Sequence, residues 1–397
     1  SFSIDTLAPS AFLTLSETQL VAGQTMTLSV SFSESLMGFD PAVDIELPTG
    51  SGTLEGGAFS ENGLTYTATF IPSAGIELKD QTIGLSKNWS DANGNAPEQS
   101  TVSQIFSIDT RPISSNGNVI KGPLENAMIW ADENGNGLFE EGEKFTRTDE
   151  NGYYQLDRDS IDTLLVATTD ENTIDVSTGA VAPEMKLSAP AGSSMVSPLT
   201  TLIASKPDLS KANLAESLGL IKSDGTPIDI TSFNPYASDS DPTLALAAEK
   251  VAQQISTLVQ SLSSIGTNAG SSSEAAQSFA FEAISDVLFQ QTKDGVKTVS
   301  LSSPDTIADV FSGSAEKLAE EVSLNISEIL EASETSQQGV AAVNSVIDTV
   351  DDLNSSEAKA AFRLSKSLAT QISDGVVTIT SAEAANTAAA EEKLAVE

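Results

Sequence analysis

The sequence predicts a multidomain protein in which two all-β sandwiches are followed by an all-α helical bundle. Apolar residues alternate with period two in the first part of the chain, and short apolar runs separated by Gly and Asn fill the next part. After about residue 197 the apolar period changes to 3.6. A length of 397 residues suits two to four domains. We therefore expect domains over 1–110, 111–196 and 197–397.

Strict alternation marks the first sandwich, for example in Thr25–Phe32 and Thr65–Phe70, with Gly, Pro and Asn turns between the alternating runs. The segment Ser1–Thr6 returns almost unchanged as Ile105–Thr110, about one sandwich length later. Two matching junctions indicate a tandem array of domains. Because the sequence opens at Ser1 with neither an initiator Met nor a signal peptide, we expect it to be a mature or excised piece of a longer protein.

Short strands around Val119, Trp130, Tyr153 and Leu165 indicate a second, smaller sandwich within residues 111–196. A long acidic loop rich in Gly and Asn separates two of these strands. This loop is the main chemical feature of the module.

Capping signals mark the helices of the third domain. Asp241 caps and Pro242 opens one helix, Ser271 and Glu274 form a capping box before another, and Ser303–Pro304 starts a third. Apolar stripes continue through these segments, and their polar faces are rich in Ser, Glu and Ala. Later helices are expected over 335–352, 356–373 and 381–396.

Two similar turns interrupt the helical domain, in Asp294–Val299 and Asp374–Ile379. Each follows a predicted helix and is followed by a run that favours β-structure. The two runs are either equivalent short strands that pair with each other or unrelated helix-ending turns.

The charge of the chain excludes several classes of function. It has 56 Asp and Glu against 19 Lys and Arg, a net charge of −37, which disfavours nucleic acids and anionic lipid surfaces as partners. It has no Cys and no His, so thiolate nucleophiles, Cys/His zinc sites and Ser-His-Asp triads are excluded. No apolar run is long enough for a membrane span. Oxygen ligands remain, and these suit Ca²⁺.

The acidic loop Asp132–Glu143 matches a twelve-residue calcium loop, with Gly137 at its sixth position. Its flanks read as strands rather than as the helices of an EF-hand. The alternative is an acidic hairpin loop without metal. The expected calcium ligands are Asp132, Asn134, Asn136, the Leu138 carbonyl and Glu143.

Two weaker calcium candidates lie in or beside the first domain. Asp91, Asn93 and Asn95 alternate around a glycine, but no bidentate Glu follows at the expected distance, so a simple Asn-Gly turn is the alternative. Asp5 and Asp109 lie at the domain junctions, where a bound cation would stiffen a linker.

Paired carboxylates are the only candidates for catalysis, because glycoside hydrolysis uses two of them. The pairs Glu320/Glu321 and Asp351/Asp352 lie in predicted helical regions with polar neighbours, and Glu140/Glu141 lies in the acidic loop. Solvated acidic faces explain the helical pairs better. We therefore expect that the protein is not an enzyme.

The residues carry a resemblance to two kinds of surface module. Val30–Glu34, Thr65–Pro72, Asp91–Asn95 and the Ile-Asp-Thr junctions resemble the bacterial Ig-like repeats of giant Gram-negative surface adhesins of the RTX and biofilm-associated types. The chain lacks the glycine-rich nonapeptide repeats of RTX proteins.

The region Val119–Leu156 is similar to the calcium-binding B-type modules of surface proteins, which are SdrD-like or carboxypeptidase regulatory-like. This resemblance implies calcium on the Asp132–Glu143 loop. Ser197–Leu202 resembles a segment that often follows such modules in large secreted bacterial proteins, while residues 240–397 resemble no family that we can name.

The resemblance implies a non-catalytic segment of a bacterial extracellular or cell-surface protein, a calcium-stiffened adhesin that acts in cell adhesion or biofilm formation. Its partners would be other domains or copies of the same protein and cell-surface or matrix ligands. The alternatives are a subunit of an S-layer or extracellular filament, and an accessory region of a secreted polysaccharide-degrading enzyme. Residues 240–397 are rich in Ala and Ser, so we expect them to be marginally stable alone and to dock on a neighbour.

Overall fold

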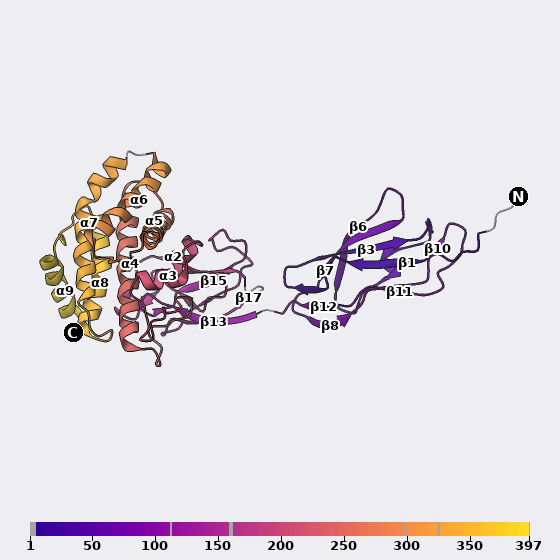
Figure 1. Cartoon of the computed structure of the whole chain (residues 1–397), viewed down its shortest axis with the longest axis horizontal. Coiled ribbons are helices and arrows are strands. Elements are labelled where there is room, and N and C mark those ends of the chain that lie inside the picture. Colours follow the sequence, from indigo (N-terminus) through magenta and orange to yellow (C-terminus); the bar gives the residue numbers. More distant parts are fainter. Residues whose placement is uncertain (1–4, 112, 159–161, 297, 324–325, 397) are drawn as a thin grey trace. The chain divides into compact units, whose positions relative to one another are not determined.

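The chain forms two compact units in the computed structural model, which describes residues 5–111, 113–158, 162–296, 298–323 and 326–396. The first unit holds Ser1–Ile113 and Arg158–Ser160, and the second holds Ser114–Asp157 and Ile161–Glu397. Strands come first and helices follow (Figure 1), which confirms the predicted fold class. Ser1–Ile4 of the predicted repeat lie outside the described residues.

The first unit is a sandwich whose largest sheet is antiparallel, in the order β1-β3-β7-β6. Buried and exposed residues alternate along β3 and β7, as the period of two predicts. The four strands are β1 (Ala11–Leu15), β3 (Met26–Phe32), β7 (Thr65–Pro72) and β6 (Gly52–Phe59).

Smaller sheets complete this unit, in the orders β2-β12-β8, β11-β9-β5 and β10-β4. Leu28, Val30, Phe70 and Phe106 are almost fully buried in the core of this unit. The elements are β2 (Gln19–Val21), β12 (Phe106–Asp109), β8 (Glu77–Gln81), β11 (Thr101–Val102), β9 (Gly84–Leu85), β5 (Ile45–Glu46), β10 (Ser90–Asp91), β4 (Leu36–Met37) and the short helix α1 (Pro41–Asp44).

The second unit begins with a β-module built from three small sheets, in the orders β17-β13-β22, β14-β19-β20 and β16-β15-β18-β21. The strands are β13 (Ile113–Val119), β14 (Leu124–Glu125), β15 (Met128–Asp132), β16 (Phe145–Arg147), β17 (Tyr153–Arg158), β18 (Leu164–Thr168), β19 (Ile174–Asp175), β20 (Ala180–Val181), β21 (Lys186–Ala189) and β22 (Met195–Val196).

Helices fill the rest of this unit, and their caps follow the sequence closely. Asp241 accepts from the backbone N–H groups of Thr243 and Leu244, as predicted. The predicted cap at Ser271 is wrong by one residue, because Ser272 accepts from the Ala275 N–H. The helices are α2 (Pro198–Ser205), α3 (Lys211–Ser217), α4 (Pro242–Asn268), α5 (Ser273–Lys293), α6 (Pro304–Val322), α7 (Ile326–Asp348), α8 (Ser356–Ser373) and α9 (Ala382–Val396).

The two Asp-Gly-Val turns share a helix-ending geometry. Asp294 and Asp374 are C-caps, and Gly295 and Gly375 follow with φ of 78° and 71°, in the left-handed region that favours glycine. In the described part of the chain neither following run forms a strand, so the pairing of two short strands is wrong.

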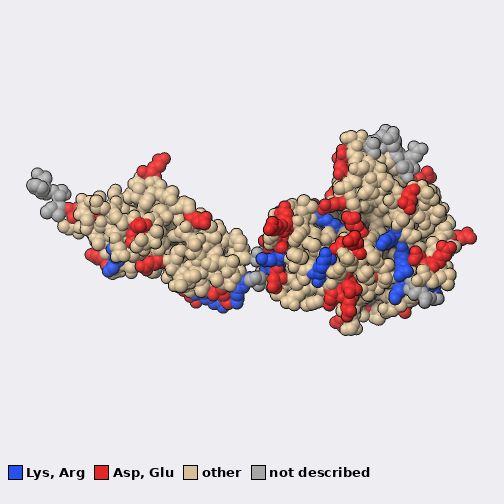
Figure 2. Space-filling model, turned by 180° about the vertical axis from the view of Figure 1, so that it is seen from behind, with Lys and Arg blue, Asp and Glu red and all other residues tan. Residues whose placement is uncertain are grey.

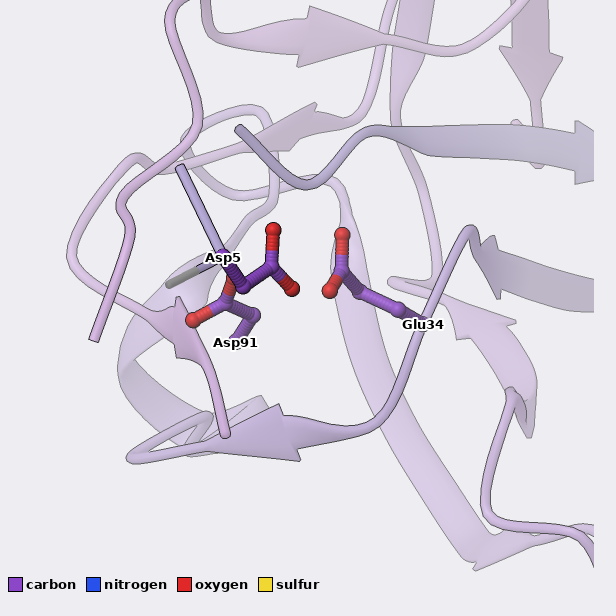
Figure 3. Close-up of side chains that lie close together, drawn as sticks. All are labelled: Asp5, Glu34 and Asp91. Carbon is purple, nitrogen blue, oxygen red and sulfur yellow. The ribbon is translucent and has the colours of Figure 1, made fainter. Parts of the chain in front are cut away.

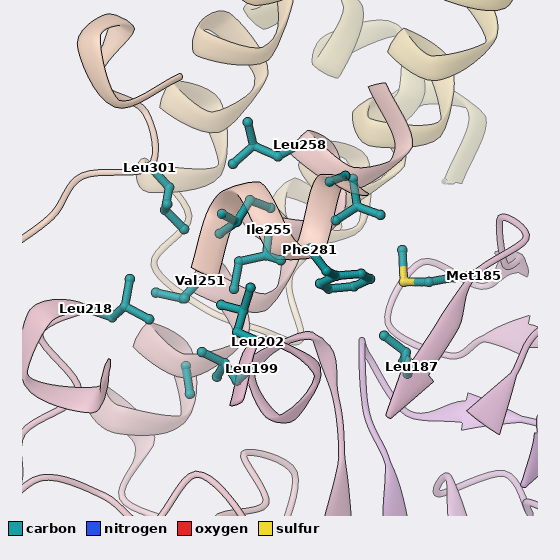
Figure 4. Close-up of a cluster of buried hydrophobic side chains, with 14 of the residues drawn as sticks. Met185, Leu187, Leu199, Leu202, Leu218, Val251, Ile255, Leu258, Phe281 and Leu301 are labelled. Carbon is teal, nitrogen blue, oxygen red and sulfur yellow. The ribbon is translucent and has the colours of Figure 1, made fainter. Parts of the chain in front are cut away.

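One hydrophobic core joins the β-module to the helices. Figure 4 shows Met185 and Leu187 on the module side, facing Leu202 and Phe281 of the helices. The parts predicted as separate domains, 111–196 and 197–397, therefore lie in one compact unit. Since alanine-rich helices offer little bulky apolar surface, the module supplies part of the core that they need.

We expect a fragment of residues 198–397 to lose cooperative unfolding, or to melt roughly 10 °C or more below a fragment of residues 114–397, because it lacks the module's share of the core. Thermal unfolding followed by circular dichroism checks this. Equal, cooperative melting of both fragments would show that the helices are a domain of their own.

Candidate metal sites

Three carboxylates of the first unit point toward one another (Figure 3). Asp5, Glu34 and Asp91 each offer one oxygen, and these oxygens all lie within 4.8 Å of one another. Asp91 is buried, Glu34 is half-buried and Asp5 is exposed. Among the described residues, no other group of three acidic residues comes this close.

Strand pairing brings Asp91 and Glu34 together. Asp91 ends β10, which pairs antiparallel with β4 so that Asp91 lies opposite Leu36. Glu34 lies in the turn between β3 and β4, two residues before Leu36. The contact depends on residues far apart in the chain.

The Asn-Gly turn holds Asp91 and Asp5 in place. Asp91 Oδ1 accepts from the backbone N–H groups of Asn93 and Asn95, both at 2.8 Å, and its Oδ2 accepts from Asn95 Nδ2 at 2.7 Å. Asn93 Nδ2 donates to Asp5 Oδ2 at 3.0 Å. The two weaker calcium candidates, Asp91 with its asparagines and Asp5, therefore meet in one place.

Burial and the neighbouring charges act on the pKa values of Glu34 and Asp91. Burial, followed by the charges of Asp91 and Asp5, raises the pKa of Glu34. Burial also opposes ionisation of Asp91, but the donors of Asn95 and Asn93 outweigh it and lower the pKa of Asp91. In the described part of the chain none of these carboxylates forms an ion pair with Lys or Arg. A divalent cation would relieve this repulsion.

Sequence reasoning did not identify Glu34 as a member of this carboxylate cluster. It lies inside the Val30–Glu34 segment on which the resemblance rests, but no local spacing links it to Asp91. Its position at the end of an alternating strand was the available signal.

Asp109 lies apart from this cluster. Its carboxylate accepts from Arg111 Nε at 2.8 Å and from a terminal nitrogen of Arg111 at 2.7 Å. The hydrogen bonds from Arg111 lower the pKa of Asp109 to about 2. A cation at Asp109 would have to displace this guanidinium.

In the acidic loop of the β-module, carboxylate side chains accept hydrogen bonds from the loop's own backbone N–H groups. Asp132 is buried, and its two oxygens accept from the N–H groups of Gly135 at 2.8 Å and Gly137 at 2.7 Å. Glu143 accepts from the N–H groups of Glu133 and Glu140, both at 3.0 Å. The first and last predicted ligands therefore both fix the shape of the loop.

The remaining predicted ligands lie in the same loop. Asn134 Oδ1 accepts from the Asn136 N–H at 2.9 Å, and Asn136 Oδ1 accepts from the Leu138 N–H at 2.7 Å. The side-chain amides of both asparagines donate to Glu140. Each oxygen keeps a second lone pair for a cation, and Glu140 adds a carboxylate that the twelve-residue pattern did not assign. Calcium on this loop stays a prediction.

Edge-to-face aromatic contacts anchor the loop to its flanking strands. The ring centroids of Trp130 and Phe139 lie 5.8 Å apart, and those of Phe139 and Phe145 lie 5.1 Å apart. Trp130 is buried, while Phe139 is 42% exposed. A change in the loop will therefore alter the surroundings of Trp130.

The paired acidic residues of the helical region are exposed to solvent, as expected. Glu320, Glu321, Asp351 and Asp352 are all exposed.

Comparison with known proteins identifies the first unit. Residues 5–108 match the sequence profile of a bacterial Ig-like domain, a range that includes all three clustered carboxylates. No curated protein matches the chain.

Solved structures give only remote likenesses. BcpA, the major pilin subunit of Bacillus cereus, is 12% identical, with 47% of this chain and 68% of that chain covered and a TM-score of 0.26. The Yersinia pseudotuberculosis adhesin InvE is 13% identical, with 47% and 64% covered and a TM-score of 0.18. An Escherichia coli alpha-2-macroglobulin fragment is 15% identical, with 42% and 67% covered and a TM-score of 0.18. At these scores the likenesses support no inference about function.

Replacing Glu34 with Gln should raise the stability of the first unit without calcium and reduce its stabilisation by calcium. The variant removes one repelling charge, while the bonds between Asp91 and its turn remain. At tenfold excess over the dissociation constant, calcium should stabilise the parent by about 1.4 kcal/mol. Thermal unfolding in EDTA and in about 10 mM Ca²⁺ measures both effects.

Glu61→Gln, at an exposed position of the same unit, is the control and should behave like the parent. If the Glu34 and Glu61 variants respond equally to calcium, the three carboxylates hold no cation.

Calcium should change the fluorescence of Trp130 through the Phe139 contact, and Glu143→Gln should weaken that response by about tenfold in calcium concentration. Glu141→Gln is the matched control, because Glu141 is exposed and was not predicted as a ligand. A calcium titration of the full chain measures the fluorescence response of the parent and of both variants. All carry Trp89→Phe, so that Trp130 is the sole tryptophan. If calcium does not change the fluorescence of Trp130, the loop is an acidic turn that binds no calcium.

Proposed function

We propose that the chain is a non-catalytic segment of a bacterial extracellular surface protein that acts in cell adhesion or biofilm formation. In this proposal, bound calcium stiffens the Ig-like unit. The observation that carries this proposal is the cluster of Asp5, Glu34 and Asp91 within the range that matches a bacterial Ig-like domain. Bacterial Ig-like domains suit a structural role at the cell surface.

Calcium suits the chain's chemistry better than other metals. The sequence has no His or Cys, so softer metals lack their preferred ligands. Carboxylates, amide oxygens and backbone carbonyls are the ligands of hard cations. The cluster in the first unit offers carboxylates, and the Asp132–Glu143 loop in the second offers both carboxylates and asparagine oxygens.

A cation at the cluster would stiffen the first unit because the three carboxylates come from three different segments. Asp5 belongs to the N-terminal segment, Glu34 to the turn after β3 and Asp91 to the end of β10. A cation bound to all three would hold the N-terminal segment on the sandwich. Without it, the exposed Asp5 is held by the asparagine side chains of the turn.

The surface charge fits such a setting. Figure 2 shows carboxylates over both units on the face that it draws, with far fewer Lys and Arg. The net charge of −37 makes calcium an effective bridge to acidic surfaces and acidic polymers. Among the helices that the structure describes, none combines the length and apolar character needed to span a bilayer.

Other domains or copies of the same protein and cell-surface or matrix ligands are the partners that this function implies. An adhesin segment should remain monomeric when calcium is added, whereas a subunit of an S-layer or filament should associate with further copies. An accessory region of a secreted polysaccharide-degrading enzyme should bind the polysaccharide without calcium.

Beads coated with the full chain should adhere to bacterial cells or to harvested biofilm matrix in calcium and lose about tenfold of that adhesion in EDTA. Light scattering after gel filtration should show a monomer in both buffers. Beads carrying the Glu34→Gln variant should adhere less than beads carrying Glu61→Gln. Calcium-dependent association of the soluble chain would favour an assembly subunit instead, and equal adhesion in EDTA would remove calcium from the function.

A further inference from the structure

The joint between the β-module and α4 contains a fully buried glutamate. Glu249 of α4 is 0% exposed, and its Oε1 accepts from the Gly122 backbone N–H of the module at 2.7 Å. Gln253 Nε2, one turn along α4, donates to the same oxygen at 2.7 Å. Glu249 therefore connects two parts of the second unit through one hydrogen bond.

The cation nearest to Glu249 is already engaged. Lys121 is 3% exposed, and its Nζ forms an ion pair with Asp175 at 2.9 Å. Asp175 is 1% exposed and also accepts from the Ser177 hydroxyl at 2.5 Å. One buried cation thus faces two buried carboxylates, and an ionised Glu249 would leave one negative charge uncompensated.

The second oxygen of Glu249 lies near the Tyr236 hydroxyl, but no hydrogen bond of ordinary geometry joins them. In the described part of the chain, Glu249 Oε2 has no hydrogen-bond partner, and neither do Gln253 Oε1 and the Tyr236 hydroxyl. Glu249 also lines a small pocket whose other walls are largely apolar, with Ile120 and Phe233 among them. An ionised carboxylate costs far more free energy in such surroundings than a protonated one.

The groups that face Glu249 come from several elements. Lys121 follows β13, Asp175 lies in β19 and Tyr236 precedes α4. On α8, Arg363 shares a recess with Lys121 and Asp175, but it donates to the Thr178 carbonyl at 2.7 Å and lies 3.8 Å from Glu392. Arg363 is therefore committed elsewhere.

Gly122 fits this contact closely. Its φ is +63°, and a Cβ there would lie 2.2 Å from Ser177 Oγ and 2.3 Å from Asp175 Oδ1. A side chain at this position would push the amide away from Glu249. The backbone of the module is shaped to reach the carboxyl group.

We propose that Glu249 is a proton-operated latch, which holds the β-module on α4 when protonated and weakens that joint when ionised. This inference does not depend on calcium or on the proposed surface function.

The titration of Glu249 gives the direction of the effect. Burial, followed by the charge of Asp175, raises its pKa from 4.5 to about 7, against the donors of Gln253 and Gly122. An acid whose pKa is raised on folding stabilises the folded state most at low pH. The stabilisation falls as pH rises from the unfolded value toward 7 and then levels off.

Thermal and denaturant unfolding of the full chain between pH 5.5 and 8, with calcium constant, tests the latch. The unfolding constant of the second unit should rise roughly 10- to 30-fold more in the parent than in Glu249→Gln across this range. Glu216→Gln, at an exposed position on α3, is the matched control and should follow the parent. Parallel pH profiles for the parent and Glu249→Gln would overturn the proposal.

Hydrogen exchange of the unaltered chain provides a second readout should Glu249→Gln fail to fold. After correction for intrinsic rates, amide protection of the peptide around Gly122 should fall between pH 6 and 8. Protection of a peptide from β7 in the first unit should not fall. Unchanged protection around Gly122 would equally overturn the latch.

Discussion

Repulsion among carboxylates that greatly outnumber the cations is the constraint on which the rest of this structure depends. With 56 acidic and 19 basic residues, the chain cannot pair each acidic group with Lys or Arg. Three means of tolerating negative charge recur. Backbone amides hold Asp132 and Asp91, an ion pair holds Asp175, and a raised pKa favours a proton on Glu249. The cluster of Asp5, Glu34 and Asp91 has no Lys or Arg partner among the described residues, which is why we propose a cation there.

Much of the fold could be predicted from local pattern. Alternation located β3 and β7, and Asp241 with Pro242 marked the start of α4, because these signals act within a few residues. The shared core of the second unit could not be predicted in this way. Met185 and Leu187 meet Leu202 and Phe281 only after the chain has folded, and periodicity does not reveal which faces will pack together.

The candidate sites also differ in whether their residues are close together in the sequence. The Asp132–Glu143 loop is contiguous, so its spacing was visible in the sequence. The cluster of the first unit joins Asp5, Glu34 and Asp91 across most of a domain, and only its Asp-Ala-Asn-Gly-Asn turn had a local signal. Glu249 had no signal at all, because its backbone partner Gly122 lies 127 residues away in the chain.

Calcium binding to the first unit is the central claim, and isothermal titration calorimetry of the EDTA-treated full chain tests it most directly. We predict saturable binding with a dissociation constant of roughly 10⁻⁴ to 10⁻³ M, in which one site is lost when Glu34 is replaced by Gln and retained when Glu61 is replaced. The absence of saturable heat, or identical stoichiometry in the Glu34 variant and the parent, would contradict it.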